Sequence, residues 1–215
     1  MTQKELNDSV KLSKTSKMPC HSWSLKAGTH CATTCSYCYA KRGRYLFPAV
    51  IAAQEWRNND WQRPDWTTRM VSALAHQPLF RLFDSGDFYT QRLADKWADV
   101  CEATPKTKYW APTKASQTVN LERLESLTNV TLRHSLGVNA ERPRRSNPHL
   151  YSMITTLGIQ YKSILPPGWD LKACRVHLCQ ADKIGQEIGK GHAHCGRCRA
   201  CWDKAIELIL YKLRK

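Results

Sequence analysis

The chain has 215 residues, of which ten are cysteine, and its 33 lysine and arginine residues against 18 acidic residues give a net charge of +15. This length is enough for one domain with its own hydrophobic core, and a composition of 42% hydrophobic and 24% charged residues is typical of a folded protein. No stretch approaches eighteen apolar residues, which excludes a transmembrane helix. Residues 1–17 are polar and lack the apolar core of a secretory signal, so we expect a cytoplasmic protein.

In a reducing compartment, ten cysteines are poorly explained by disulfides, and metal, iron–sulfur or thiol chemistry is the expected use. The positive charge lies at the two ends of the chain. Residues 1–47 carry eight basic against two acidic residues and residues 141–215 carry fourteen against six, whereas residues 48–140 are nearly balanced. This distribution favours an anionic partner such as nucleic acid, although solubility alone also accounts for it.

The hydrophobic pattern predicts alternating strands and helices. In chain order these are a strand over 21–25, helices over 48–60 and 64–77, a strand over 79–83, a helix over 92–103, a strand over 107–113, a helix over 121–127 and a strand over 130–138. Such alternation favours a parallel sheet with crossover helices, and hence the α/β class. A breaker run at 141–149 follows the last of these strands.

The rest of the chain is expected to form a separate cysteine-rich extension. Pro166-Pro167-Gly168 marks the predicted boundary between a first domain, residues 1–165, and this segment, residues 166–215. Its last eleven residues, 205–215, are predicted to form an amphipathic helix with a basic end.

Three cysteines near the start of the chain have the spacing Cys-x3-Cys-x2-Cys: Cys31, Cys35 and Cys38, with Tyr37 directly before the third. Three thiolates on one short loop can hold three irons of a [4Fe-4S] cluster and leave the fourth iron open, as a catalytic metal site requires. Zinc is the alternative, with His21 or His30 as the fourth ligand.

This motif resembles the cluster-binding loop of the radical S-adenosylmethionine (radical SAM) enzymes. The resemblance implies a partial (β/α)6 TIM-like barrel with the loop after its first strand, and S-adenosylmethionine chelated to the open iron. It further implies reductive cleavage of that cofactor to methionine and a 5′-deoxyadenosyl radical, with the electron supplied by a reductant such as flavodoxin or ferredoxin. Cys31, Cys35 and Cys38 would then be the cluster ligands, and Tyr37 would pack near the adenine.

The same resemblance assigns cofactor-binding residues after later strands. Ser85, Gly86 and Asp87 stand where the family, more often with Gly-Gly-Glu, binds the amino group of S-adenosylmethionine; a plain strand-to-helix turn is the alternative. Reacting groups in barrel enzymes lie at the carboxyl ends of strands. Accordingly, we expect Thr113 and Ser135 at the cofactor site and Lys114 and Asn139 as candidate catalytic residues, with a capping or surface role as the alternative.

Two longer phrases, FRLFDSGDFYTQRLADKWADV and TKYWAPTKAS, make the chain similar to small radical SAM-like proteins encoded by bacteriophages. This similarity extends from about Cys31 to Trp202. It places the protein in the host cytoplasm if the chain is phage-encoded.

A second cysteine group, near the end of the chain, has the spacing Cys195-x2-Cys198-x2-Cys201, with Cys179 upstream. This is a ferredoxin-like way to hold a second [4Fe-4S] cluster, closed by four thiolates, and the pattern resembles the terminal pattern of the phage proteins. Cys174 is a spare candidate for the fourth ligand. Structural zinc is the alternative metal, because His177, His192 and His194 lie close in sequence. The two isolated cysteines, Cys20 and Cys101, are predicted to be small buried residues.

Basic residues lie close in sequence to both cysteine groups and suggest a polyanionic substrate, such as a phage DNA base or a tRNA base. They are Lys41, Arg42, Arg44, Arg142, Arg144, Arg145, Lys190, Arg197 and Arg199. A base in a duplex would have to be flipped out, and the candidate stacking residues are Trp56, Trp61, Trp66, Trp110 and Trp169. The alternatives are a radical SAM enzyme acting on a peptide or small metabolite, and a zinc- or cluster-stabilised nucleic-acid-binding protein that is not an enzyme.

Overall fold

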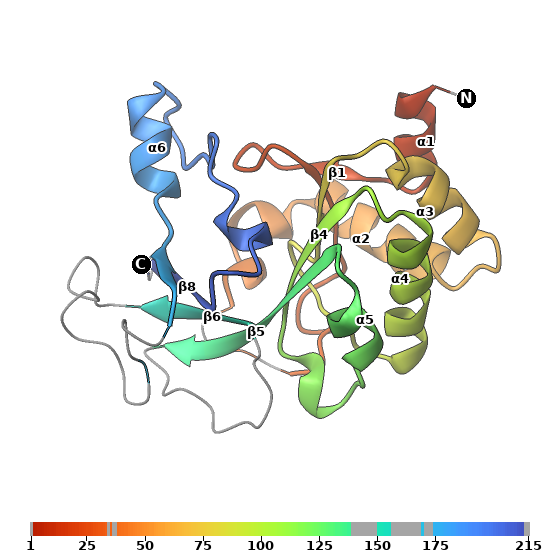
Figure 1. Cartoon of the computed structure of the whole chain (residues 1–215). Coiled ribbons are helices and arrows are strands. Elements are labelled where there is room, and N and C mark those ends of the chain that lie inside the picture. The colour runs from red at the N-terminus through yellow and green to blue at the C-terminus, as the bar shows by residue number, and fades with distance from the viewer. Residues whose placement is uncertain are drawn as a thin grey trace.

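The computed structural model describes residues 2–33, 35, 38–138, 150–155, 169 and 174–212. Its centre is a sheet in which eight described strands follow the order β1-β2-β3-β4-β5-β6-β8-β7 (Figure 1). Every neighbouring pair from β2 to β7 is parallel, and β1 runs antiparallel to β2. The fold is therefore mixed α/β, as predicted, with a mostly parallel sheet that does not close on itself.

The described strands are β1 (Ser13–Lys14), β2 (His21–Trp23), β3 (Leu79–Leu82), β4 (Lys108–Thr113), β5 (Val130–Val138), β6 (Leu150–Thr155), β7 (Val176–Leu178) and β8 (Leu208–Lys212). The α-helices are α1 (Gln3–Ser9), α2 (Pro48–Asp60), α3 (Trp66–Leu74), α4 (Gln91–Ala103), α5 (Glu122–Ser126) and α6 (Ala181–Glu187). Short 3-10 turns include η1 (Tyr39–Lys41), η2 (Gly43–Leu46), η3 (Ala115–Gln117) and η5 (Ala200–Trp202). The eight elements predicted between residues 21 and 138 are all present, with ends that differ by up to three residues.

Helices α3, α4 and α5 pack against one face of the sheet, and the core between them is rich in tryptophan (Figure 1). The fully buried ring of Trp23, on β2, lies 5.8 Å from Trp66 of α3 and 5.5 Å from Trp97 of α4 in edge-on contacts. Such aromatic pairs add to the free energy gained from their buried area. The amino end of α4 is fixed by Thr90, whose hydroxyl accepts from Leu93 N at 3.3 Å.

The opposite face of the sheet is covered by the C-terminal cysteine loop rather than by an α-helix. Trp202, in η5, packs edge-on against Trp110 of β4 at 5.4 Å, and its indole N–H donates to the carbonyl of Phe80 in β3 at 3.2 Å. Thr131 of β5 donates to the carbonyl of Trp202 at 3.0 Å. The segment after residue 165 thus joins the same sheet, both through this loop and through strands β7 and β8.

The helix predicted over residues 205–215 is wrong. Residues Leu208–Lys212 form β8, which lies between β6 and β7 and is parallel to both. Leu208, Ile209 and Leu210 are all fully buried, and a continuous apolar run of this length suits a strand covered on both faces. Periodicity alone does not separate such a run from a buried helical segment.

No helix among the described residues is long and apolar enough to cross a bilayer.

Candidate metal centres

The loop that carries the first cysteine group is joined to the loop after β3 at the carboxyl edge of the sheet. Leu25 N donates to the carbonyl of Ser85 at 3.0 Å, and Asp87 N donates to the carbonyl of His30 at 2.9 Å. Gly86 between them has φ +77°, and a Cβ at this position would lie 2.8 Å from Leu25 Cβ. Only glycine fits such a close approach with a positive φ. The loop of the first cysteine group and the loop of Ser85, Gly86 and Asp87, which the family resemblance assigns to one site, are therefore neighbours in space.

Within the first group, the three cysteines are partly exposed and form no disulfide. Cys31 Sγ accepts from the backbone N–H of Gly28 at 3.4 Å, and Cys38 N donates to the carbonyl of Cys35 at 3.3 Å. Burial raises the pKa of Cys31, and the negative charges of Asp87, Cys38 and Cys35 raise it further. Among the described residues no three His, Cys, Asp or Glu side chains, these cysteines included, lie close enough to hold one metal ion. Tyr37 lies outside the described residues.

The carboxylate of Asp87 is buried and joins the ends of β3 and β4. Its Oδ1 accepts from Thr113 Oγ1 at 2.7 Å and from Phe88 N at 2.8 Å, and its Oδ2 accepts from Lys114 N at 2.7 Å. Burial raises the pKa of Asp87 to about 6, against the effect of these three donors. Each carboxylate oxygen can accept two hydrogen bonds, so Oδ2 retains capacity for one further donor.

Ser85 is also committed to the local structure. Its buried hydroxyl accepts from Gln54 Nε2 at 2.8 Å and donates to the carbonyl of Leu25 at 2.7 Å. It therefore fixes the loop after β3 to α2 and to the strand end of β2.

The remaining sequence-predicted residues are spread along the same edge. Thr113 accepts from Ala115 N at 3.0 Å as well as donating to Asp87. Lys114 presents its backbone N–H to Asp87, and Ser135 Oγ lies 3.2 Å from Ser152 Oγ of β6. Asn139 lies outside the described residues.

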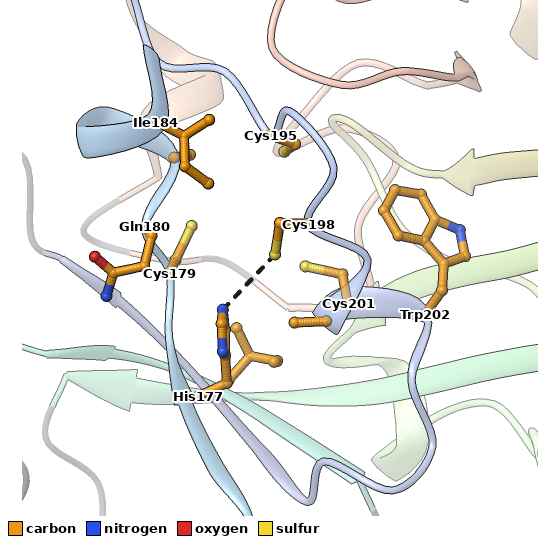
Figure 2. A pocket seen from close by; sticks show the side chains of 11 residues that line it. His177, Cys179, Gln180, Ile184, Cys195, Cys198, Cys201 and Trp202 are labelled. Carbon is orange, nitrogen blue, oxygen red and sulfur yellow. Dashed lines mark hydrogen bonds between the residues drawn. The ribbon is translucent and has the colours of Figure 1, made fainter. Parts of the chain in front are cut away.

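The second cysteine group lines one hollow, with side chains from two separate stretches of chain pointing into it (Figure 2). Cys179 directly follows β7 and donates its backbone N–H to the carbonyl of Leu210 at 2.8 Å. Cys195, Cys198 and Cys201 approach from the loop between α6 and β8. The predicted set of four is therefore brought together around one space.

Cys174 is placed elsewhere. It is buried in a separate apolar cluster with Tyr151 and Trp169. The structure therefore separates the spare cysteine from the four that line the hollow.

His177 also lines this hollow, and its Nε2 lies 3.8 Å from Cys198 Sγ (Figure 2). This contact lowers the pKa of Cys198, whereas burial raises the pKa of Cys195 and raises that of Cys201 to about 11. His192 is exposed, and His194 Nδ1 accepts from Gly196 N at 2.9 Å. Of the three histidines named from the sequence, His177 is the one that faces the cysteines.

The donor set of the hollow fits a thiolate-bound metal, but its spacing is not preformed for zinc. Tetrahedral zinc with bonds of about 2.3 Å needs sulfurs about 3.8 Å apart. No three His, Cys, Asp or Glu side chains of the described chain are close enough to hold a single ion. The hollow has a volume of about 20 Å³, which is room for about one water-sized sphere. Zinc would therefore require the thiols to close in.

A buried arginine, which the sequence reasoning missed, holds the second cysteine loop. Arg133 of β5 is fully buried and donates to the carbonyls of Cys201 at 3.1 Å, Ala200 at 3.2 Å, Asp203 at 2.8 Å and Ile206 at 2.8 Å. Burial lowers its pKa. No local pattern predicts this role, because the acceptors lie more than sixty residues downstream.

Arg81 of β3 lies between the two cysteine groups. It pairs with Asp84 at 2.5 Å, donates to Tyr39 Oη at 3.4 Å, and its guanidinium lies 4.6 Å from the ring of Trp110. Trp110 in turn packs against Trp202. Because Tyr39 and Trp202 directly follow the last cysteine of each group, these contacts connect the two candidate centres.

Two further predictions have a structural outcome. Cys20 and Cys101 are buried, as predicted. Burial raises the pKa of Cys20 to about 12, and the neighbouring Cys195 raises it further. The prediction of base-stacking tryptophans is wrong for four of the five residues, because their side chains are buried: Trp61, Trp66, Trp110 and Trp169. Trp56 is half-buried.

The fold and the two cysteine groups define an α/β protein with two candidate thiolate metal centres. The chain belongs to the Gene product 88 family, whose model matches residues 2–204. This membership agrees with a bacteriophage protein, and it does not specify a chemistry. Neither the curated proteins nor the solved structures gave a match to the chain.

Proposed function

We propose that this protein is a radical SAM enzyme with an auxiliary metal centre. The observation that carries the proposal is the junction at the carboxyl edge of the sheet. There, the loop with Cys31, Cys35 and Cys38 is hydrogen-bonded through His30 to the backbone of Asp87, in the loop after β3. Reacting groups of parallel α/β folds gather at this edge.

The wider fold is compatible with a partial (β/α)6 TIM-like barrel. Six parallel strands, β2, β3, β4, β5, β6 and β8, follow one another in the sheet, with β7 added beyond them. We infer that the face covered by η5 corresponds to the inside of this open barrel. The second cysteine group then lies against the inner face, close to the substrate side of the first.

When bound, a [4Fe-4S] cluster and S-adenosylmethionine supply one-electron cleavage of the sulfonium and a carbon radical that abstracts hydrogen. The chain's own part is to bind and orient. Cys31, Cys35 and Cys38 would hold three irons. Asp87 Oδ2 would accept one further hydrogen bond, from the ammonium group of S-adenosylmethionine. Lys114 extends from the strand end beside Asp87, where we propose that it contacts substrate.

At the second centre we propose another [4Fe-4S] cluster held by Cys179, Cys195, Cys198 and Cys201. Four thiolates are the ligand set that both iron–sulfur clusters and structural zinc accept. The lack of three closely spaced donors among the described residues favours the wider cluster over a single zinc ion. Metal analysis separates the two.

The test is anaerobic reconstitution followed by counts of iron, sulfide and zinc, and then an assay for 5′-deoxyadenosine after addition of S-adenosylmethionine and a reductant. We expect about eight irons per chain and formation of 5′-deoxyadenosine. When Cys31, Cys35 and Cys38 are changed to Ala, the protein should lose four of its irons and should no longer form 5′-deoxyadenosine. Cys101→Ala, which removes a buried thiol outside both groups, is the matched control.

Zinc alone, with no cleavage of S-adenosylmethionine, would overturn the proposal. The chain would then be a metal-stabilised binding protein. About four irons together with zinc would retain the enzyme and assign zinc to the second centre.

A further inference from the structure

Residues 39–47, between the first cysteine group and α2, expose large apolar side chains to solvent. Tyr39 is 51%, Leu46 56% and Phe47 61% exposed. In the described part of the chain, the only other large hydrophobic residue with such exposure is Ile188, at 47%. A concentration of this kind in nine residues marks a contact surface, whereas single exposed apolar residues need no explanation.

The same segment is positively charged. Lys41, Arg42 and Arg44 are exposed, and residues 39–47 contain no acidic side chain. None of the three cations forms an ion pair with a described carboxylate. Helix α2 begins directly after Phe47, and the positive end of its dipole faces this segment. Cations interleaved with exposed aromatic rings suit a polyanion that also offers flat apolar faces.

The segment is nevertheless held in a fixed position. The hydroxyl of Tyr39 donates to the carbonyl of Asp84 at 2.6 Å, and that of Tyr45 donates to Asp84 Oδ2 at 2.9 Å. The two rings pack edge-on at 5.7 Å, and Asp84 itself pairs with Arg81. Asp84 lies in the loop after β3 and directly precedes Ser85. Tyr39 and Tyr45 therefore anchor the segment beside the first cysteine group, and less backbone conformational entropy is lost when a partner binds.

We propose that residues 39–47 bind single-stranded nucleic acid, with a base stacked on Phe47 and phosphates held by Arg42 and Arg44. This deepens the proposed function, on which it rests for its biological meaning, by naming the substrate class. An unpaired base exposes the flat face that Phe47 requires, whereas bases in a duplex are covered by their neighbours. Cations alone would bind a duplex equally well.

The test is fluorescence anisotropy with labelled twelve-nucleotide single-stranded DNA and RNA and with the matching duplex, measured without S-adenosylmethionine. We expect the single strand to bind more tightly than the duplex. Phe47→Ala should weaken single-strand binding about tenfold, and Phe47→Trp should restore it. Arg42→Ala combined with Arg44→Ala should reduce the steepness of the plot of log K against log salt by about 1.4. Each of the two lost phosphate contacts contributes about 0.7 to that slope.

Matched controls lie elsewhere on the surface. Ile188→Ala removes a similarly exposed apolar side chain, and Lys106→Ala with Lys108→Ala removes two exposed cations at the opposite edge of the sheet. Neither should change binding. Equal losses in these controls would show diffuse electrostatic attraction and overturn the proposal.

Two other results would also overturn it. One is unchanged oligonucleotide binding in Phe47→Ala. The other is self-association of the wild type that Phe47→Ala abolishes while nucleic-acid binding stays the same, which would make the segment a protein interface. Because none of these measurements uses cleavage of S-adenosylmethionine, failure here is distinguishable from failure of the proposed enzyme.

Discussion

The two cysteine groups are held in different ways. The first stands on a single loop, and two backbone hydrogen bonds tie that loop to the loop after β3. The second is assembled from Cys179 after β7 and from a loop that crosses the sheet, and the buried Arg133 fixes that loop through four of its carbonyls. The contrast predicts that the second group contributes more to the stability of the fold than the first, although the cysteines of both groups are only partly exposed.

The sharpest test of this contrast is to remove each group separately. Changing Cys31, Cys35 and Cys38 to Ala should abolish formation of 5′-deoxyadenosine and leave the free energy of unfolding nearly unchanged. Changing Cys195, Cys198 and Cys201 to Ala should lower the stability markedly, because metal binding energy there is folding energy. Urea denaturation together with iron counts measures both effects. Equal losses of stability in the two variants would erase the distinction.

A smaller but selective effect is expected at Arg133. Arg133→Met removes a buried cation and leaves four backbone carbonyls without their donor, which should cost about 3–5 kcal/mol. It should also release metal from the second centre while the first retains its iron. The control is Arg123→Met, at an exposed arginine paired with Asp99 and Glu102, where about 1 kcal/mol or less is expected. Metal loss from both centres would contradict a selective role.

The first site should reveal itself by its pH dependence. The folded-state pKa of Asp87 is raised to about 6 from an ordinary value of 3.8. Stability from this group is therefore fully present below about pH 4 and is lost as pH rises through 6, by about 2–3 kcal/mol. The stability of the wild type relative to Asp87→Asn should fall between pH 4 and 7 in urea denaturation. A difference that stays constant over this range would mean that Asp87 does not titrate there.

The smallest effect concerns His177, which contacts a sulfur of the second group only. If that centre holds a [4Fe-4S] cluster, His177→Leu should lower its reduction potential by about 40 mV, the equivalent of one hydrogen bond of about 1 kcal/mol in a one-electron couple. An electron paramagnetic resonance titration measures the shift. His192→Leu, at an exposed position in the same loop, should leave the potential unchanged. A change in the signal of the first cluster would contradict the placement of His177.

The sequence was most informative where the hydrophobic residues repeat with a single clear period. The strand and helix pattern from residue 21 to 138 predicts the elements and their parallel pairing, because each segment alternates clearly with period 2 or 3.6. The run around Leu208 failed because an apolar stretch fits a helix and a buried strand equally well. The close spacing within each cysteine group was visible in the sequence, whereas the preference for Cys179 over Cys174 rested on the resemblance to the phage proteins.

Long-range partners were beyond the sequence. Nothing near Arg133 indicates that its guanidinium binds carbonyls of the second cysteine loop. Candidate stacking residues were likewise sought among tryptophans, whereas the exposed aromatic rings of the described chain belong to Tyr39 and Phe47, since burial depends on packing rather than on residue type alone. The motifs therefore located both cysteine groups, and the tertiary contacts decide how each is supported.

The position of β8 has a consequence for the order of events during synthesis. Among the described strands, β7 pairs only with β8, and β8 is made some thirty residues later. Until β8 has left the ribosome and entered the sheet beside β6, Cys179 has no fixed place opposite Cys195, Cys198 and Cys201. Because domains fold as their chains emerge, the loop of the first group can form early, whereas the second centre must load last. Metal bound at the second centre would then indicate that the whole sheet has formed.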